Sequence, residues 1–275
     1  MMAFFDRVLR MLLYYGGINA LYMALRKNHL AVVGYHSISD PTHRVGHHAD
    51  VYQHLSVSVS MFEKQMKFLQ DNGYIFLRFS DLRDIREGKR LLPRRAVLVY
   101  FDDGYKDNYI HAYPILKRLG IPATVFVVTD CIDQKKLLWD SVIDPARANI
   151  FLSWDEIRAM QDVFDIDTHT VSHRKLTALT ADEVREEFGV SRKRIEEMTG
   201  ARVIALSYPK GRFTTDARRI AEEVGFETML AYGRGFRHSA DLRHLEIIPM
   251  EHRDSWVAFR VKMGAYYPVI QLLGK

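Results

Sequence analysis

The sequence of 275 residues contains a single cysteine, Cys131. One cysteine cannot form an intrachain disulfide or supply the thiolates of a cysteine metal cage, and this usage suits a reducing compartment. The sequence also has no arginine-rich block and no zinc-knuckle spacing, so we expect no nucleic-acid partner. Its 39 basic and 34 acidic residues leave a net charge of +5, which fits an acidic polymer, an anionic lipid surface or simple solubility equally well.

Residues 11–25 carry no charged side chain. They are fewer than the roughly 20 residues that a membrane-spanning helix needs, and Gly16-Gly17 weakens a helix there. Three interpretations stay open: a helix packed on the domain, a helix lying on a membrane surface, and a cleaved signal, which Asp6 and the lack of a cleavage site disfavour. Basic residues flank the segment at Arg7, Arg10, Arg26 and Lys27. We therefore expect a cytoplasmic protein or one peripheral to the inner membrane.

From residue 30 onward, short apolar runs alternate with helical patterns. Such runs are typical of strands buried on both faces of a parallel sheet. They predict strands at residues 30–35, 96–101, 123–128, 163–167, 203–207, 227–231 and 245–249. Capping boxes predict helix starts at Ser60, Ser153 and Thr180. We predict an apolar N-terminal helix over 1–29, one α/β domain with a barrel-like parallel sheet over 30–254, and a helical tail over 255–275.

Two carboxylates, Asp102 and Asp103, follow the apolar run at 96–101. Carboxylates at the end of a buried strand are costly unless a cation or strong donors compensate them. Two imidazoles, His169 and His173, follow a second apolar stretch. One carboxylate and two imidazoles can hold a divalent metal with open positions for water, while the other carboxylate acts as a base. The alternatives are a simple turn at the aspartates and solvated loop histidines, since the chain has 12 histidines.

These residues resemble the motifs of the polysaccharide deacetylase family, the NodB-homology carbohydrate esterases. Residues 100–104 are similar to its first motif and residues 169–173 to its second, and the resemblance extends over about residues 30–250. It implies a distorted seven-stranded (β/α) barrel and the removal of N-acetyl groups from amino sugars of a polysaccharide or glycan precursor. It also implies Asp102 as the general base, and as metal ligands Asp103, His169 and His173. The ion would be Zn²⁺ or, failing that, Co²⁺, Ni²⁺, Mn²⁺ or Fe²⁺.

Within the family, the chain resembles the branch that acts on poly-N-acetylglucosamine, which has a Tyr-His pair near its start. That resemblance implies His36 as the general acid, with His238, His244 and His252 as rivals. The third motif departs from the family at residues 207–210, which lack its arginine and have Lys210 in place of its aromatic residue. The backbone N–H of Lys210 would still serve the oxyanion. Asp167 is expected to orient a ligand imidazole.

The substrate of such an enzyme would be an N-acetylated glycan, and aromatic side chains near the motifs would contact its sugar rings. We expect substrate contacts from Tyr105, Trp139 and Tyr208, whereas Trp154 fits the core better. Two alternatives stay open: hydrolysis of another non-peptide C–N bond in a small molecule, and a glycan-binding protein that has lost catalysis. The sugar, the linkage, the metal and the oligomeric state are not encoded in any pattern that we recognise.

Overall fold

The computed structural model describes residues 2–25, 29–39, 54–134, 150–232 and 242–264, together with Tyr266 and Val269. Its strands are β1 (His29–Tyr35), β2 (Ser37–Ile38), β3 (Ser56–Val57), β4 (Ile75–Phe76), β5 (Arg95–Phe101), β6 (Ala123–Val127), β7 (Phe164–Thr168), β8 (Ala205–Ser207), β9 (Thr228–Tyr232) and β10 (His244–Pro249). Its α-helices are α1 (Met2–Tyr15), α2 (Ile18–Leu25), α4 (Val59–Asp71), α5 (Asp81–Arg86), α6 (Tyr113–Leu119), α7 (Thr129–Asp133), α8 (Trp154–Ala159), α9 (Ala181–Thr199), α10 (Thr215–Val224) and α11 (Trp256–Lys262).

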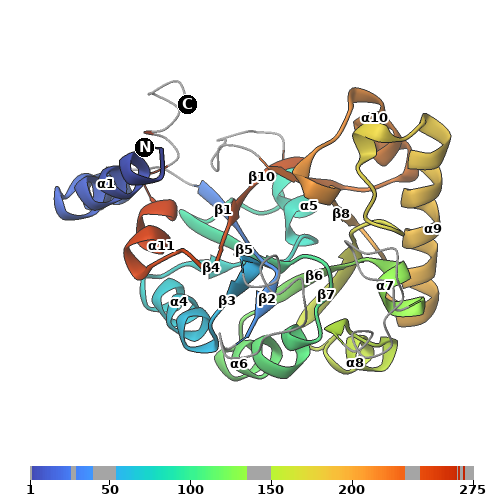
Figure 1. Cartoon of the computed structure of the whole chain (residues 1–275), viewed down its shortest axis with the longest axis horizontal. Coiled ribbons are helices and arrows are strands. Elements are labelled where there is room, and N and C mark those ends of the chain that lie inside the picture. The colour runs from blue at the N-terminus through green and yellow to red at the C-terminus, as the bar shows by residue number, and fades with distance from the viewer. Residues whose placement is uncertain are drawn as a thin grey trace.

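The central feature is a closed barrel of parallel strands (Figure 1). Around it the strands follow the order β1-β10-β9-β8-β7-β6-β5, and β5 pairs again with β1 along its whole length. The short strand β4 pairs with the beginning of β5, whereas β6 pairs with its end, so the barrel is distorted at this junction. The predicted seven-stranded distorted barrel is confirmed, and each predicted strand lies within two residues of an observed one.

Alternating side chains of each strand enter two different cores, as expected for strands buried on both faces. On β5, Val97, Val99 and Phe101 pack toward the surrounding helices. The residues between them pack inside the barrel. That interior is tight, because a Cβ added at Gly34 on the neighbouring β1 would lie 2.2 Å from the hydroxyl of Tyr100. The same alternation makes the residue after Phe101 inward-facing, at the carboxyl end of the strand.

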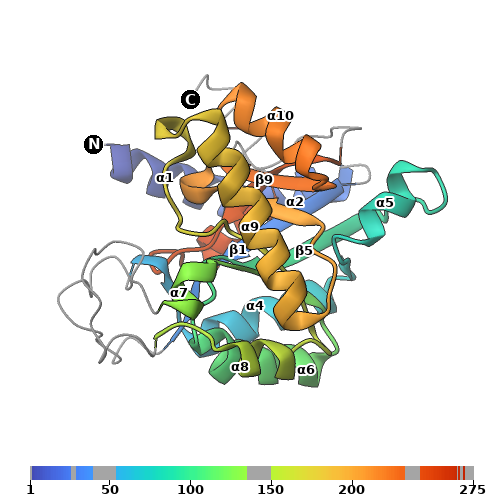
Figure 2. The ribbon, with the colours of Figure 1, turned by 90° about the vertical axis from the view of Figure 1, so that its right-hand side faces the viewer.

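Helices cover the barrel, with α9 and α10 on one side and α4, α6 and α8 below (Figure 2). The capping boxes predicted at Ser153 and Thr180 are confirmed at the starts of α8 and α9. The capping box predicted at Ser60 is wrong, because α4 begins two residues earlier and Ser58 accepts the backbone N–H of Met61. Ser58 and Ser60 both precede the apolar stripe of this helix, and Ser58 is the residue that caps it.

The N-terminal segment forms two helices that break at Gly16-Gly17, where the prediction had one. Figure 1 shows α1 beside α11, and Leu13 of α1 packs with Val261 of α11 in a small apolar cluster. Within the described residues, no single helix meets the length and hydropathy of a membrane span. Residues 8–15 and 18–25 meet them only together, as a pair bent by 63°.

Candidate metal centre and active site

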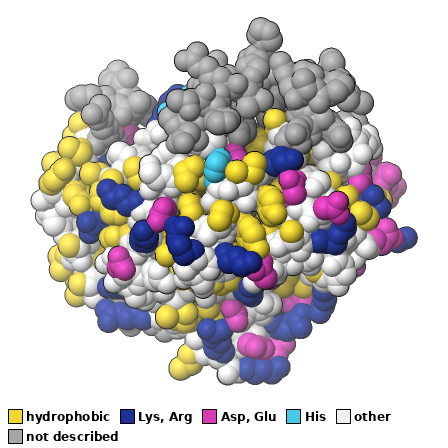
Figure 3. Space-filling view, turned by 90° about the horizontal axis from the view of Figure 1, so that it is seen from below, with side chains coloured by type: hydrophobic (Ala, Val, Ile, Leu, Met, Phe, Trp, Pro, Cys, Tyr) yellow, Lys and Arg dark blue, Asp and Glu magenta, His cyan; other side chains and the backbone are white. Residues whose placement is uncertain are grey.

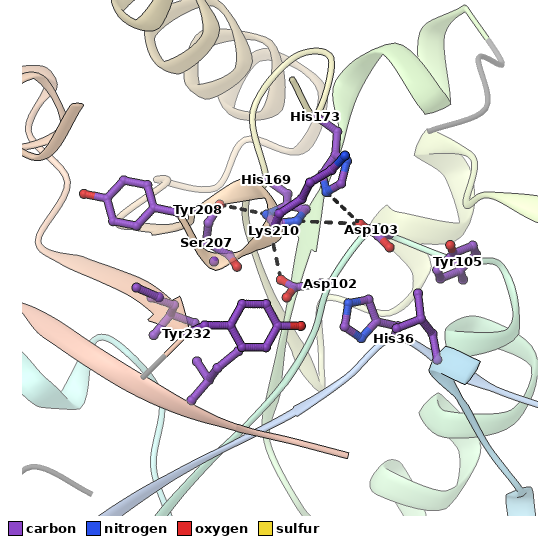
Figure 4. Close-up of a pocket in the computed structure, with 15 residues that line it drawn as sticks. His36, Asp102, Asp103, Tyr105, His169, His173, Ser207, Tyr208, Lys210 and Tyr232 are labelled. Atoms are coloured by element: carbon purple, nitrogen blue, oxygen red, sulfur yellow. Dashed lines mark hydrogen bonds and ion pairs between the residues drawn. The ribbon is translucent and has the colours of Figure 1, made fainter. Parts of the chain in front are cut away.

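A cavity of about 310 Å³ lies at the carboxyl ends of the barrel strands. Its walls come from the ends of β1, β5, β7, β8, β9 and β10, where the chain leaves each strand. Figure 4 shows the polar side chains that converge on it. They are His36, Asp102, Asp103, His169, His173 and Lys210. Leu55, Leu230 and Ile247 form an apolar part of the wall.

The end of β5 positions both aspartates. The N–H of Asp102 still donates to the carbonyl of Tyr35, at 2.9 Å, so Asp102 continues the inward side of the strand. Asp103 and Gly104 then adopt left-handed conformations, with φ of 71° and 70°. This turn brings the Asp103 carboxylate into the same cavity, although alternation along a continuing strand would have directed it to the opposite side. Asparagine and aspartate tolerate this conformation better than most residues do.

The end of β7 positions the two histidines through a strained turn. Thr170 and His173 both have positive φ, 74° and 55°, and this conformation is rare for a β-branched residue such as Thr170. Glu187 of α9 holds the turn: its carboxylate accepts the backbone N–H groups of Val171 and Ser172, each at 2.9 Å, and the Ser172 hydroxyl. A helix from the outer layer therefore determines the conformation of the histidine motif.

Asp103, His169 and His173 offer one ligand atom each within 4.8 Å of one another, the arrangement of a metal site. The Nε2 atoms of the two histidines lie 3.6 and 3.7 Å from Oδ1 of Asp103. Two ligands bound about 2.1 Å from one ion at a tetrahedral angle lie about 3.4 Å apart, so these separations fit. Oδ1 of Asp103 is buried and has no hydrogen-bond partner among the residues that the structure describes. The residues present therefore fit a divalent ion.

A hydrogen bond sets the tautomer of His169. Its Nδ1 lies 2.7 Å from the carbonyl oxygen of Ser207. Because a carbonyl only accepts, Nδ1 carries the proton and Nε2 presents its lone pair to the metal site. The expectation that Asp167 orients a ligand imidazole is wrong. Its carboxylate accepts the backbone N–H groups of Ile204 and Ala205, each at 2.8 Å, one layer deeper in the barrel.

Burial shifts the acid–base behaviour of the site. Desolvation raises the pKa of Asp102 to about 7, and likewise raises the pKa of Asp103 to about 7, before any cation is bound. Burial, with a smaller contribution from His169, lowers the pKa of His36 to about 3. Burial also lowers the pKa of His173 to about 2. The imidazoles are therefore neutral near pH 7, as metal ligation requires, and a bound cation would restore the charged form of the aspartates.

His36 faces the two aspartates from the β1 side of the cavity (Figure 4). Asn108 donates to its carbonyl oxygen at 2.8 Å and holds the backbone there. The rival His244 stands at the beginning of β10 and contacts Glu222, so it lies at the opposite end of the barrel. The rival His252 is exposed and does not line the cavity. His238 lies outside the described residues.

Lys210 occupies the third position of a tight turn. Gly211 donates to the carbonyl of Tyr208 at 2.7 Å, and Lys210 has φ 59° and ψ 16°, where such turns usually have glycine. The ring of Tyr232 closes the turn from outside, since a Cβ added at Gly211 would lie 1.8 Å from its Cδ2. Figure 4 shows the Tyr232 hydroxyl directed to the Asp102 side of the cavity.

The predicted aromatic substrate contacts change in the structure. The Tyr105 ring is fully buried and stacks on Phe151, so the expectation of a sugar-stacking face there is wrong. The Tyr208 ring is likewise buried, stacks on Phe213 and points away from Asp102 in Figure 4. Both residues still contribute to the cavity wall. Trp139 lies outside the described residues. Trp154 packs against the core and donates to Asp133 at 2.7 Å.

Several contributors to the site were absent from the sequence analysis, among them Leu55, Leu230, Ile247, Glu187, the Ser207 carbonyl and Tyr232. Glu187 lies in the middle of a long helix rich in glutamate, so nothing in the sequence separates it from its neighbours. The Ser207 contact uses a backbone atom. Tyr232 had a signal, because it directly follows the predicted strand at 227–231 just as Asp102 follows the one at 96–101.

Comparisons with known proteins agree with this geometry. A family model described as polysaccharide deacetylase matches residues 89–229. YxkH of Bacillus subtilis (strain 168) is 31% identical over 199 residues, and the poly-beta-1,6-N-acetyl-D-glucosamine N-deacetylase of Staphylococcus aureus (strain MSSA476) is 27% identical over 195. The alignments cover 72% and 67% of this chain and 62% of each relative, so the chain spans under two thirds of their length. The fold is similar to that of a solved de-N-acetylase from Aggregatibacter actinomycetemcomitans, with a TM-score of 0.74, 22% identity, and coverage of 86% of this chain and 100% of that one.

Proposed function

This chain belongs to the polysaccharide deacetylase family, and we propose that it hydrolyses N-acetyl groups of amino sugars in a polysaccharide or glycan precursor. The observation that carries the proposal is the convergence of Asp103, His169 and His173, with Asp102 beside them in one cavity. A binding protein needs no buried carboxylate next to a cation site, whereas amide hydrolysis needs a base within reach of the attacking water.

The donor set of one carboxylate and two imidazoles suits Zn²⁺ best, with Co²⁺, Ni²⁺, Mn²⁺ and Fe²⁺ as alternatives. A divalent ion held by these residues would supply Lewis acidity toward the amide carbonyl and the attacking water. Asp103 and His169 come from different strand ends, so the barrel itself holds the site together.

Asp102 acts as the general base in this proposal. Its pKa of about 7 in the buried site is near that of an efficient base at neutral pH, and a cation nearby keeps it ionised. His36 acts as the acid toward the leaving amine. Burial leaves His36 neutral at the outset, so we propose that it receives the proton that Asp102 takes from the attacking water and passes it to the amine nitrogen as the C–N bond breaks.

The remaining wall suits the acetamide group. The Lys210 turn lines the cavity, and we assign the N–H of Lys210 to the developing oxyanion. The apolar wall of Leu55, Leu230 and Ile247 matches the acetyl methyl group, because burying a methyl against these side chains costs no hydrogen bond.

The test is acetate release from poly-β-1,6-N-acetylglucosamine and from chitin oligomers, with metal content measured on the same preparation. Wild type is expected to release acetate in proportion to its bound metal. Asp102→Asn is expected to lose at least about 100-fold in rate while keeping the metal, since Asp102 is the base and not a ligand. Asp182→Asn, at an almost fully exposed aspartate on α9, is the matched control and should behave like wild type.

Two outcomes would replace the proposal. Hydrolysis of small cyclic amides with no release from any glycan would indicate another C–N bond as the target. Binding of glycan with equally negligible acetate release by wild type and Asp102→Asn would indicate a protein that has lost catalysis. Either outcome would leave the family membership intact.

A further inference from the structure

The outward face of α1 is a continuous apolar stripe. Val8, Met11, Leu12 and Tyr15 are exposed, and they recur at positions i, i+3, i+4 and i+7, which is one face of a helix. Leu12 is 61% and Tyr15 is 70% exposed. A helix on the surface of a globular domain normally shows its polar residues there instead.

The face continues on α2. Ile18, Leu21 and Leu25 are exposed at i, i+3 and i+7, and Leu25 is 74% exposed. More than half of the large hydrophobic side chains that are exposed in the described part of the chain lie on these two short helices. On the face seen from below, basic and acidic side chains are interspersed among apolar ones (Figure 3). We call these seven exposed residues of α1 and α2 the apolar face: Val8, Met11, Leu12, Tyr15, Ile18, Leu21 and Leu25.

The polar groups of α1 are used on its inward side. Arg10 forms an ion pair with buried Asp254 at 3.0 Å and with Asp6 at 2.9 Å. Arg260 of α11 donates to the hydroxyl of Tyr14 at 2.9 Å. Ionic contacts and the buried Leu13 together tie the helix to the domain, while the apolar side chains of the opposite face are left outside. These contacts also hold α1 along the side of the barrel.

The side of α2 that faces the domain is also held by a polar contact. Asn19 is buried and donates to the carbonyl of Arg260 at 3.1 Å. It fits closely against Gly264, where an added Cβ would lie 1.9 Å from its Oδ1. The two helices are therefore anchored parts of the fold, and the exposure of the apolar face follows from how they dock.

One exposed basic residue in the part of the chain that the structure describes stands beside this face. Arg94, from the segment before β5, is exposed and donates to the carbonyl of Ala24 at 2.8 Å, so a cation stands at the end of α2. In the sequence, residues 1–28 contain four basic residues and one acidic residue, and none of the charges falls within residues 11–25. An apolar face with a cation at its end, in a segment with an excess of basic residues, complements a surface of lipid tails beneath anionic headgroups.

We propose that the apolar face docks the protein on an anionic lipid bilayer, with α1 and α2 lying in the interface and the barrel outside it. The charge pattern distinguishes this occupant from a second copy of the chain, because two such faces brought together would oppose their bordering cations. The inference is independent of the proposed function, since docking requires no deacetylation.

The test is flotation of the full-length protein with phosphatidylcholine vesicles and with vesicles containing 30% phosphatidylglycerol. Wild type is expected to float with the anionic vesicles and at least tenfold less with the zwitterionic ones. Leu12→Glu combined with Leu21→Glu should lower the partition onto anionic vesicles at least tenfold. Val190→Glu, at a half-exposed apolar residue on α9, is the matched control and should float like wild type.

Arg94→Gln gives a second measurement that leaves the apolar face intact. It should weaken binding to anionic vesicles without changing binding to zwitterionic ones, and it should reduce the effect of added salt on binding. Equal flotation of wild type and the double glutamate variant would overturn the proposal. So would a wild-type protein that floats with neither kind of vesicle. Light scattering gives the remaining outcome: a dimer that the double variant dissociates, with no vesicle binding, would identify the face as a contact between copies.

Discussion

The Nδ1 of His169 donates to the carbonyl oxygen of Ser207 across 2.7 Å, and this contact joins two sequence motifs. It fixes which nitrogen of the imidazole faces Asp103. The same backbone segment continues into the Lys210 turn, so one short stretch both orients a ligand and lines the substrate side of the cavity. Loss of the third motif's arginine leaves this contact in place because the contact uses only a main-chain atom.

His169→Asn separates the two roles of that imidazole. The amide nitrogen of asparagine can replace Nδ1 as donor to Ser207, but nothing replaces Nε2. We expect the folded protein to persist and its affinity for Zn²⁺ to fall at least about 100-fold, measured by competition with a chromogenic chelator. His244→Asn, at the other end of the barrel, should leave the affinity unchanged. Equal affinity in wild type and His169→Asn would remove His169 from the ligand set.

Glu187 is expected to be a positioning residue. Glu187→Ala leaves the N–H groups of Val171 and Ser172 without their carboxylate and releases the strained turn. We expect a loss of about 2–3 kcal/mol in the free energy of unfolding and a 10- to 100-fold loss of zinc affinity. Glu187→Gln keeps one oxygen acceptor and should recover part of both. A stability loss with no change in zinc affinity would show that the turn is structural only.

Lys210→Gly tests the strained turn and the oxyanion assignment together. Glycine adopts the left-handed conformation without strain, so we expect the free energy of unfolding to rise by up to about 1 kcal/mol. Lys210→Ala removes the same ammonium but keeps the strain. If the backbone N–H stabilises the oxyanion, both variants should deacetylate within about threefold of wild type. A tenfold loss in both would assign the role to the ammonium instead.

Asp167 should make stability depend on pH. Burial raises its pKa from 3.8 to about 7 in the folded protein, so the folded state binds this proton more tightly than the unfolded state does. Its contribution to stability is fully present below pH 3.8 and is lost as the pH rises through 7. Asparagine does not titrate. Between pH 4 and pH 7 the unfolding free energy of wild type should therefore fall by on the order of 3 kcal/mol relative to Asp167→Asn, measured by denaturant titration. A pH-independent difference would show that Asp167 stays ionised.

The regular parts of the fold were predictable because they depend on local pattern. Short runs of apolar residues indicated all seven barrel strands, and the capping boxes at Ser153 and Thr180 marked two helix starts. Irregular turns were not predictable in this way. Asp103 adopts a left-handed conformation that brings both carboxylates to one cavity, and the next residue, Gly104, lies close against Val127 of the neighbouring strand β6.

Side-chain exposure was the least predictable property of the site. Tyr105 and Tyr208 are aromatic residues beside motifs, and their sequence neighbourhood favoured sugar contacts. Phe151, from a distant segment of the chain, covers the Tyr105 ring, and Phe213, from the loop that follows Tyr208, covers the Tyr208 ring. The same holds for Asp167, whose acceptor role depends on the N–H groups of a neighbouring strand.

By itself, the sequence identified the groups that we propose carry the chemistry, because each of the two motifs is a short local pattern that follows an apolar run. Tertiary structure alone decided their arrangement: which imidazole nitrogen faces Asp103, which helix clamps the histidine turn, and which rings are covered. It also turned the uncharged segment at residues 11–25 into a docked helix pair with its apolar side outward. These outcomes depend on contacts between residues far apart in the chain, and no local pattern contains them.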